Sequence, residues 1–134
     1  QAMATNTGGG GEYQPLSKSY KTFDTEYDSY KLLDNYYHRL EIIKKQEKYL
    51  AEYEKKAANS IMKKKVYEGY AESTKKTIQN LKNDNKDIMH ILDKRGVTED
   101  IIKEHGGKYR YDAQEKAFNK KILKKYGVDL SKIK

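Results

Sequence analysis

Apolar residues return every three or four positions from Asp24 to Arg95, a stretch with no proline and a single glycine, Gly69. Lys, Glu, Asp, Gln and Asn fill most of the positions between them. This spacing predicts amphipathic α-helix rather than β-strand. The apolar stripe consists of Tyr27, Tyr30, Leu33, Tyr37, Leu40, Ile43, Leu50, Tyr53, Ala57, Ile61, Met62, Val66, Tyr70, Thr74, Ile78, Leu81, Ile88, Ile91 and Leu92.

The first predicted helix runs from about Asp24 to Ala57, with Thr25 and Asp28 as its capping box. The next residues, at 58–60, include Asn and Ser, which compete for backbone hydrogen bonds and often cap a following helix. We therefore expect the helix to end there. The alternative is one uninterrupted helix through 58–60, and over residues 24–95 such a rod would measure roughly 100 Å at 1.5 Å per residue.

Four shorter helices are predicted after this break, over residues 60–82, 85–94, 98–105 and 112–126. The cluster of Asn and Asp at 83–85 suggests the gap between the first two, and glycines at 96, 106 and 127 suggest helix ends. Their apolar faces can close a small bundle. The expected bundle core is Ile61, Val66, Tyr70, Ile78, Leu81, Ile88, Ile91, Leu92, Ile101, Ile102, Phe118, Ile122 and Leu123.

The sequence thus predicts an all-α fold with a long N-terminal helical extension and a small C-terminal four-helix bundle. The expected division is a flexible N-terminal arm at 1–20, an extended helical arm at 21–58, and the bundle with a basic tail at 59–134. The stripe of the extended arm must bury on the bundle or on another subunit. We expect a subunit interface made by Tyr27, Tyr30, Leu33, Tyr37, Leu40 and Ile43.

The N-terminal arm is predicted from Gly8–Gly11 and Pro15, which disfavour a helix. Two interpretations stay open. The arm is a disordered tail in an isolated monomer, or it orders against a neighbouring subunit or a phosphate backbone. Gln1 and Ala2 precede Met3, and we expect Met3 to be the natural first residue.

Composition narrows the classes of protein further. Hydrophobic residues make up 36% of the chain, against roughly 45–50% in an average globular protein, so the core must be a thin seam between helices. The chain has 13 Tyr but no Trp and no Cys, which excludes disulfides and thiolate metal sites. No apolar run approaches the length of a transmembrane helix.

Motifs of catalysis are absent from the sequence. The glycine tract lacks the Lys-Ser/Thr pair of a phosphate-binding loop. The three histidines, His38, His90 and His105, do not have the spacing of a zinc-binding helix. We therefore expect no enzyme activity and no cofactor or metal site.

Charge gives the most informative signal. The net charge of +8 lies entirely after residue 60, because the basic and acidic residues of 1–60 balance. Such an excess attracts polyanions. Lysine contacts phosphates without reading bases, and only three arginines could make bidentate base contacts. The lysine groups beside the predicted helix joint are the expected DNA-binding residues: Lys44, Lys45, Lys48, Lys55, Lys56, Lys63, Lys64 and Lys65.

Other interpretations of the lysines stay open. A run of charges is usually a solvated helix face, and a second basic group, Lys120, Lys121, Lys124 and Lys125, is the alternative DNA surface. The balanced charge of residues 21–60 leaves open which half of the chain meets DNA.

The chain resembles the small, basic, cysteine-free coat proteins of filamentous archaeal viruses of lipothrixvirus and rudivirus type. The resemblance rests on the Gly8–Gly11 arm, the helical stretch from Asp24, the bundle from about Ser60 and the length from Met3, and it covers nearly the whole chain. It implies a major capsid protein of the virion, a viral nucleoprotein that pairs with itself or a sister coat protein. Such dimers wrap linear double-stranded DNA, in many members in A form, and stack into a helical filament. For lipothrixvirus members it also implies a lipid envelope as a neighbour.

The alternative function is a helical scaffold or adaptor module of a phage or conjugation assembly that binds no nucleic acid. A packaging protein should bind duplex DNA of any sequence with a strong dependence on salt. A scaffold should ignore DNA and form discrete oligomers.

Overall fold

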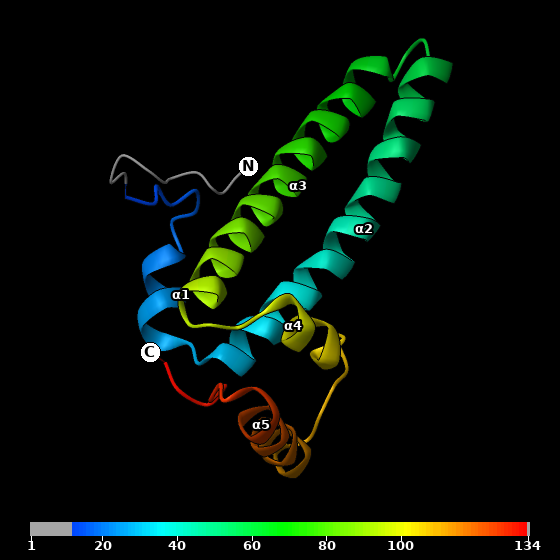
Figure 1. Ribbon diagram of the computed structural model, residues 1–134. Helices are drawn as coiled ribbons and strands as arrows, with labels where there is room; N and C mark the ends of the chain where they lie inside the picture. The colour runs from blue at the N-terminus through cyan, green and yellow to red at the C-terminus, as the bar shows by residue number, and fades with distance from the viewer. Residues whose placement is uncertain (1–11, 134) are drawn as a thin grey trace.

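The computed structural model describes residues 12–133, and the expectations for Met3 and the Gly8–Gly11 arm lie outside these residues. The described residues form five helices and no strand, so the prediction of an all-α fold is confirmed (Figure 1). Its helices are α1 (Tyr20–Glu26), α2 (Ser29–Asn59), α3 (Lys64–Lys94), α4 (Glu99–His105) and α5 (Asp112–Tyr126).

Helices α2 and α3 form a long antiparallel hairpin (Figure 1). The predicted break at 58–60 is confirmed, since α2 ends at Asn59. The Ser60 hydroxyl accepts a hydrogen bond from the Lys63 N–H at 3.0 Å, which closes the turn before α3 begins at Lys64. The hairpin tip is therefore the short segment 60–63.

The core lies at the base of the hairpin, where α1, α4 and α5 close around its open end (Figure 1). It combines residues from all five helices with Val97 of the loop between α3 and α4 and Leu130 of the segment after α5. Farther toward the tip the seam between α2 and α3 thins to small residues such as Ala57, Ala71 and Thr74. The core consists of Phe23, Tyr30, Leu32, Leu33, Ile88, Ile91, Leu92, Val97, Ile101, Ile102, Phe118, Ile122 and Leu130.

The predicted first helix is broken at Tyr27 and Asp28, so the capping box of Thr25 and Asp28 is wrong. Asp28 instead caps α2, because its carboxylate accepts from the Lys31 N–H at 2.7 Å. Arg95, at the end of α3, stabilises the corner between α1 and α2. Its guanidinium donates to the carbonyl oxygens of Asp24 and Tyr27 at 3.0 and 2.8 Å, which satisfies the open end of α1.

The predicted gap at 83–85 is also wrong, since α3 runs through it without a break. Two of the three polar side chains there bind α2 instead of capping, and Asn83 accepts from Gln79 within α3. Asp84 pairs with Arg39 at 3.1 Å, and Asn85 donates to the Tyr36 carbonyl at 3.2 Å. Contacts between helices therefore override the local preference of Asn and Asp for turns.

The division into an extended arm and a separate four-helix bundle is corrected by the contact between α2 and α3. The stripe of α2 buries within its own chain, and Tyr30, Leu33 and Ile43 are inside the seam rather than free for a subunit. Tyr27 and Tyr37 are half-buried against the core. Among the six predicted interface residues, only Leu40 is exposed, at 40% of its surface.

The segments before α1 and after α5 are both tied to the core. The Asp87 carboxylate on α3 accepts hydrogen bonds from the Tyr13 hydroxyl and from the N–H groups of Leu16 and Ser17. Residues 12–20 of the predicted flexible arm are therefore held in place. The predicted basic tail is anchored too, since Leu130 is buried and its carbonyl accepts from the Tyr30 N–H at 3.0 Å.

Candidate nucleic-acid interface

The eight lysines expected to bind DNA all lie on the hairpin and are all exposed. Apolar residues of α2 occupy the face toward the seam, and Lys56 lies over the Tyr67 ring of α3, 5.8 Å from its centre. The five nearest the tip are Lys55, Lys56, Lys63, Lys64 and Lys65. Between Glu54 and Glu68 the chain carries no acidic residue, so the tip is uniformly positive.

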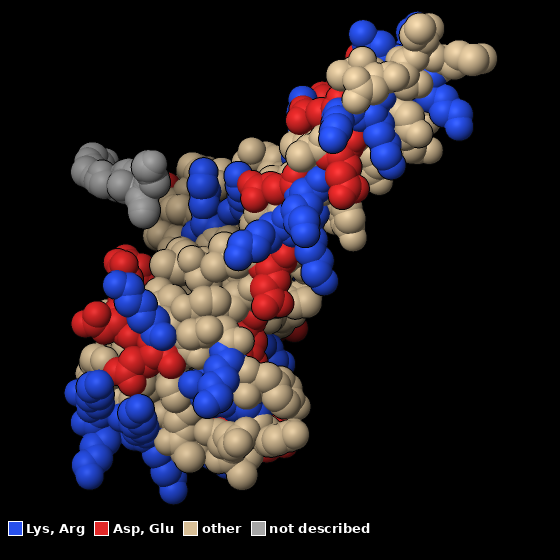
Figure 2. Space-filling model, turned by 90° about the vertical axis from the view of Figure 1, so that its right-hand side faces the viewer, with Lys and Arg blue, Asp and Glu red and all other residues tan. Residues whose placement is uncertain are grey.

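Ion pairs distinguish the tip from the rest of the hairpin. In the middle of the hairpin, Lys75 faces Glu54 at 3.8 Å and Lys82 faces Glu47 at 3.7 Å. None of the eight lysines takes part in an ion pair with another residue of 12–133. Figure 2 shows this change, with red and blue mixed along the hairpin and mostly blue and tan near its end. The tip lysines are thus free to meet an external anion.

The arginines are committed to the fold. Arg39 binds Asp84 and Asn35, and Arg95 binds the carbonyls at the α1–α2 corner. Arg110 donates to the carbonyls of Glu104 and His105, and its guanidinium lies 3.9 Å from the centre of the Phe118 ring. All three guanidinium groups are therefore engaged within the protein and are not free to contact a base edge in bidentate fashion. The exposed cations that could contact nucleic acid are lysines.

A second basic group covers α5 at the opposite end of the molecule (Figure 2). Two of its lysines are paired, because Glu104 of α4 lies 2.8 Å from Lys125 and 3.5 Å from Lys121. The hydrogen bonds from Lys125 and Tyr126 lower the pKa of Glu104 to about 2. Lys120 and Lys124 remain exposed. This group fastens α4 to α5 and offers fewer free charges than the hairpin tip.

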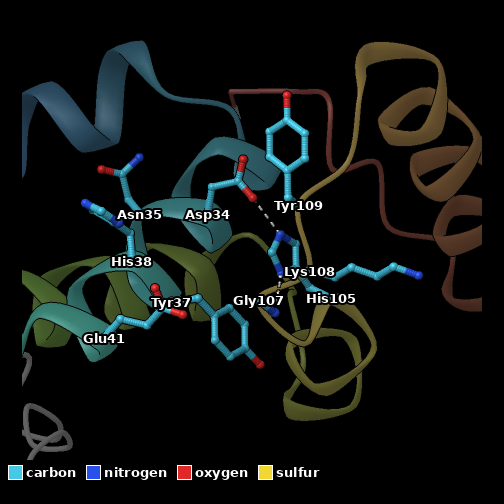
Figure 3. A pocket seen from close by; sticks show the side chains of 9 residues that line it. All are labelled: Asp34, Asn35, Tyr37, His38, Glu41, His105, Gly107, Lys108 and Tyr109. Atoms are coloured by element: carbon cyan, nitrogen blue, oxygen red, sulfur yellow. Dashed lines mark hydrogen bonds and ion pairs between the residues drawn. The ribbon is translucent and has the colours of Figure 1, made fainter. Parts of the chain in front are cut away.

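The hollow with the most distinctive chemistry lies between α2 and the loop after α4, and measures about 490 Å³. Figure 3 shows Asp34 and His105 pointing toward one another inside it. His105 Nε2 lies 2.8 Å from Asp34 Oδ1, and the His105 ring stacks on Tyr37 with centroids 5.3 Å apart. His105 is 1% exposed, so this contact is part of the interior.

The Asp34–His105 pair resembles half of a catalytic triad but lacks a free base. The Gly107 N–H donates to His105 Nδ1 at 3.0 Å. An amide can only donate, so Nδ1 accepts and Nε2 carries the proton toward Asp34. Both ring nitrogens are occupied, and no nitrogen is left to take a proton from a substrate. The pair holds the end of α4 against α2.

The state of His105 predicts a loss of stability in mild acid. Burial, aided by Arg110, outweighs Asp34 and lowers the pKa of His105 below its ordinary value. The unfolded chain then binds the proton more readily, so this stabilisation is complete above about pH 6.5 and declines below it. We expect a loss of up to about 1.4 kcal/mol per pH unit in urea denaturation between pH 7.5 and 5.

Burial also lowers the pKa of His90, so the two histidines need separate variants. His105→Gln should remove one part of the pH dependence and His90→Gln another. An identical slope in His105→Gln and in the unchanged protein would contradict the assignment to His105.

The tip also holds two residues that sequence patterning misplaced. Ile61 was expected in the bundle core and Met62 on the apolar stripe of a helix, but they are 97% and 95% exposed. The periodicity of apolar residues does not by itself show that these two residues lie in a turn. The available signal was their place directly after the capping residues at 58–60 and directly before three lysines.

No protein-family model, curated protein or solved structure matches the chain. Within residues 12–133, no helix combines the length and apolar character needed to cross a bilayer. Over the same span, no three His, Cys, Asp or Glu side chains gather as a metal site would require. What the chain does must therefore be inferred from its own residues.

Proposed function

We propose that this chain is a structural DNA-packaging protein. In this role it binds linear double-stranded DNA without sequence preference and assembles, with itself or a sister subunit, into the helical coat of a filamentous virion. The observation that carries the proposal is the hairpin tip, where five exposed lysines project from 55–65, a segment without an acidic residue, and none of the five forms an ion pair with another residue of 12–133.

The geometry favours backbone contact over base recognition. An α2 of 31 residues is roughly 46 Å long, more than one turn of duplex DNA, which repeats every 34–36 Å or so. Duplex DNA carries one phosphate charge per roughly 1.7 Å. Lysines spread along such a helix can therefore meet several phosphates at once, and lysine–phosphate contacts carry no sequence information.

The arrangement of the helices differs from the expected N-terminal extension on a four-helix bundle. The hairpin α2–α3 is the extension, and α1, α4 and α5 with the hairpin's open end are the compact part (Figure 1). In this arrangement the lysine-rich tip reaches outward from the core. A rigid hairpin fits a packaging role because its lysines are held in place before DNA binds.

The proposal predicts a specific change in salt dependence. Each phosphate neutralised contributes about 0.9 to the slope of log affinity against log salt. Replacing Lys63, Lys64 and Lys65 with Gln should flatten this slope by roughly two to three units for every duplex sequence alike. Fluorescence anisotropy with two unrelated duplexes over a salt series measures it. The fold should be unchanged, since exposed substitutions alter stability by about 0.5 kcal/mol or less.

The matched control replaces Lys75, Lys76 and Lys82 with Gln. It removes the same charge from the same helix, but Lys75 and Lys82 already face Glu54 and Glu47, so its slope should change less. An unchanged slope in the tip variant would move the DNA surface to α5. Absence of DNA binding by the assembled protein would contradict packaging and favour the scaffold function.

A further inference from the structure

The end of the hairpin exposes an apolar pair, Ile61 and Met62, that has no cover within residues 12–133. These side chains are 97% and 95% exposed, more than any other large apolar residue described. They follow Ser60 in the turn and are flanked by the tip lysines at 55–56 and 63–65. Exposed apolar residues in a rim of charge are typical of an interaction site. We call Ile61 and Met62 the tip pair.

A complementary hollow lies on the same chain, near the base of the hairpin. Two adjoining cavities of about 490 and 400 Å³ share Tyr37, Glu41 and Gly107. The second is lined by Leu40 and Ile43, and Leu40 leaves 40% of its surface uncovered. Together the cavities form a groove along α2 that is large enough for two aliphatic side chains. We call it the groove.

Charge favours contact between the tip and the groove. Carboxylates of Asp34, Glu41 and Glu47 line the groove, against the ammonium groups of Lys44 and Lys108. Asp34 and Glu47 stay half-exposed beside their internal partners, and Glu41 has no ion pair among the described residues. The tip brings five lysines and no acid. If each of the three carboxylates pairs with one lysine, two lysines remain for phosphates.

We propose that the tip pair of one copy docks in the groove of a second copy of this chain. The two surfaces are different and lie about 21 residues apart along α2, or roughly 30 Å. A chain cannot reach its own groove with its own tip, because both belong to one rigid hairpin. Contact between unlike surfaces does not close into a two-fold dimer and extends into rings or open filaments.

This inference deepens the assembly half of the proposed function and rests on it, while its contacts do not require DNA. A tip that carries two apolar side chains buries less area than a stable dimer interface of roughly 1,200–2,000 Å². Each contact is therefore weak by itself. Free protein should assemble only at high concentration, and DNA should promote assembly by holding copies side by side.

A complementation experiment tests the docking directly. The tip variant is Ile61→Ser with Met62→Ser, which keeps every lysine. The groove variant is Glu41→Lys, and Glu52→Lys, an exposed α2 residue outside the groove, is its charge-matched control. Each protein is studied by analytical ultracentrifugation over rising concentration, alone and in equimolar mixtures.

The unchanged protein and the control should form polymers, and the tip variant should associate at least about 100-fold more weakly because two apolar side chains no longer become buried. The groove variant should also stay monomeric. A mixture of the two variants should form dimers and stop there, because only one intact tip and one intact groove remain per pair. Polymers from either variant alone, or a mixture that stays monomeric, would overturn the docking.

Two further measurements separate this inference from the DNA proposal and from other occupants. The tip variant should bind duplex DNA with the same salt slope as the unchanged protein. If no protein binds DNA while the complementation succeeds, the packaging proposal fails and the docking stands. If the unchanged protein stays monomeric but its tip pair is needed to sediment with anionic phospholipid vesicles, the occupant is a bilayer and the docking is overturned.

Discussion

Replacing Leu33 with alanine should lower the free energy of unfolding by about 2–5 kcal/mol. Leu33 is 0% exposed and belongs to the core cluster with Ile88 and Leu92. Truncation removes apolar surface burial and leaves a cavity that the surrounding helices cannot fully fill. Urea denaturation followed by circular dichroism measures the loss.

The matched control is Leu40→Ala on the same helix. Leu40 lines the groove and is 40% exposed, so its truncation should cost about 1 kcal/mol, less than that of Leu33. In assembly the order of the two effects should be reversed, because Leu40→Ala weakens association between copies more than Leu33→Ala does. Repeating the denaturation at several protein concentrations separates core from interface, because only an interface makes apparent stability concentration-dependent. If Leu33→Ala were as stable as the unchanged monomer but failed to assemble, Leu33 would belong to an interface after all.

The contrast between Leu33 and Leu40 shows what hydrophobic periodicity establishes. Both residues lie on the apolar stripe of α2, and the stripe correctly predicted that this segment is a helix with one buried face. Periodicity says nothing about which surface covers that face. The partner of α2 turned out to be α3 of the same chain, which buries Leu33 and leaves Leu40 at the edge of the seam.

Helix ends were predictable where a backbone conformation demanded a particular residue. Gly96, Gly106 and Gly127 adopt positive φ of 81°, 62° and 75°, which other residues rarely adopt, and α3, α4 and α5 end at or just before them. Asn and Asp were less informative. At 83–85 they serve contacts between helices rather than caps, and a sequence offers no local sign of that difference.

The candidate site was predictable in its charge and not in its shape. The lysines at 55–56 and 63–65 are exposed and unpaired among the described residues, as their density suggested. The tip pair depends on the turn between α2 and α3, and the groove depends on α2 and the loop after α4, which only the fold brings together. The role of Asp87 had no local signal either, because its partners lie about 70 residues earlier in the chain.

Asp87 carries the other large expected effect. Its carboxylate is 0% exposed and accepts from the Tyr13 hydroxyl at 2.5 Å, from the Leu16 N–H at 3.0 Å and from the Ser17 N–H at 2.7 Å. Burial, strengthened by Asp87, raises the pKa of Tyr13, so the phenol keeps its proton and remains a donor. The Tyr13 ring also stacks on His90 with centroids 3.6 Å apart. Residues 13–17 are thereby fastened across α3.

Asp87→Asn should release this segment and lower the free energy of unfolding by about 2–4 kcal/mol. An asparagine amide offers one oxygen as acceptor and turns its NH₂ group toward buried donors, so at least one donor loses its partner. Trypsin should then cut after the exposed Lys18 much faster than in the unchanged protein, which mass spectrometry of timed digests detects. The control is Asp93→Asn, an exposed carboxylate on the same helix, which should leave both stability and the rate of cleavage unchanged. Equal cleavage after Lys18 in the two variants would show that Asp87 does not hold the N-terminal segment in solution.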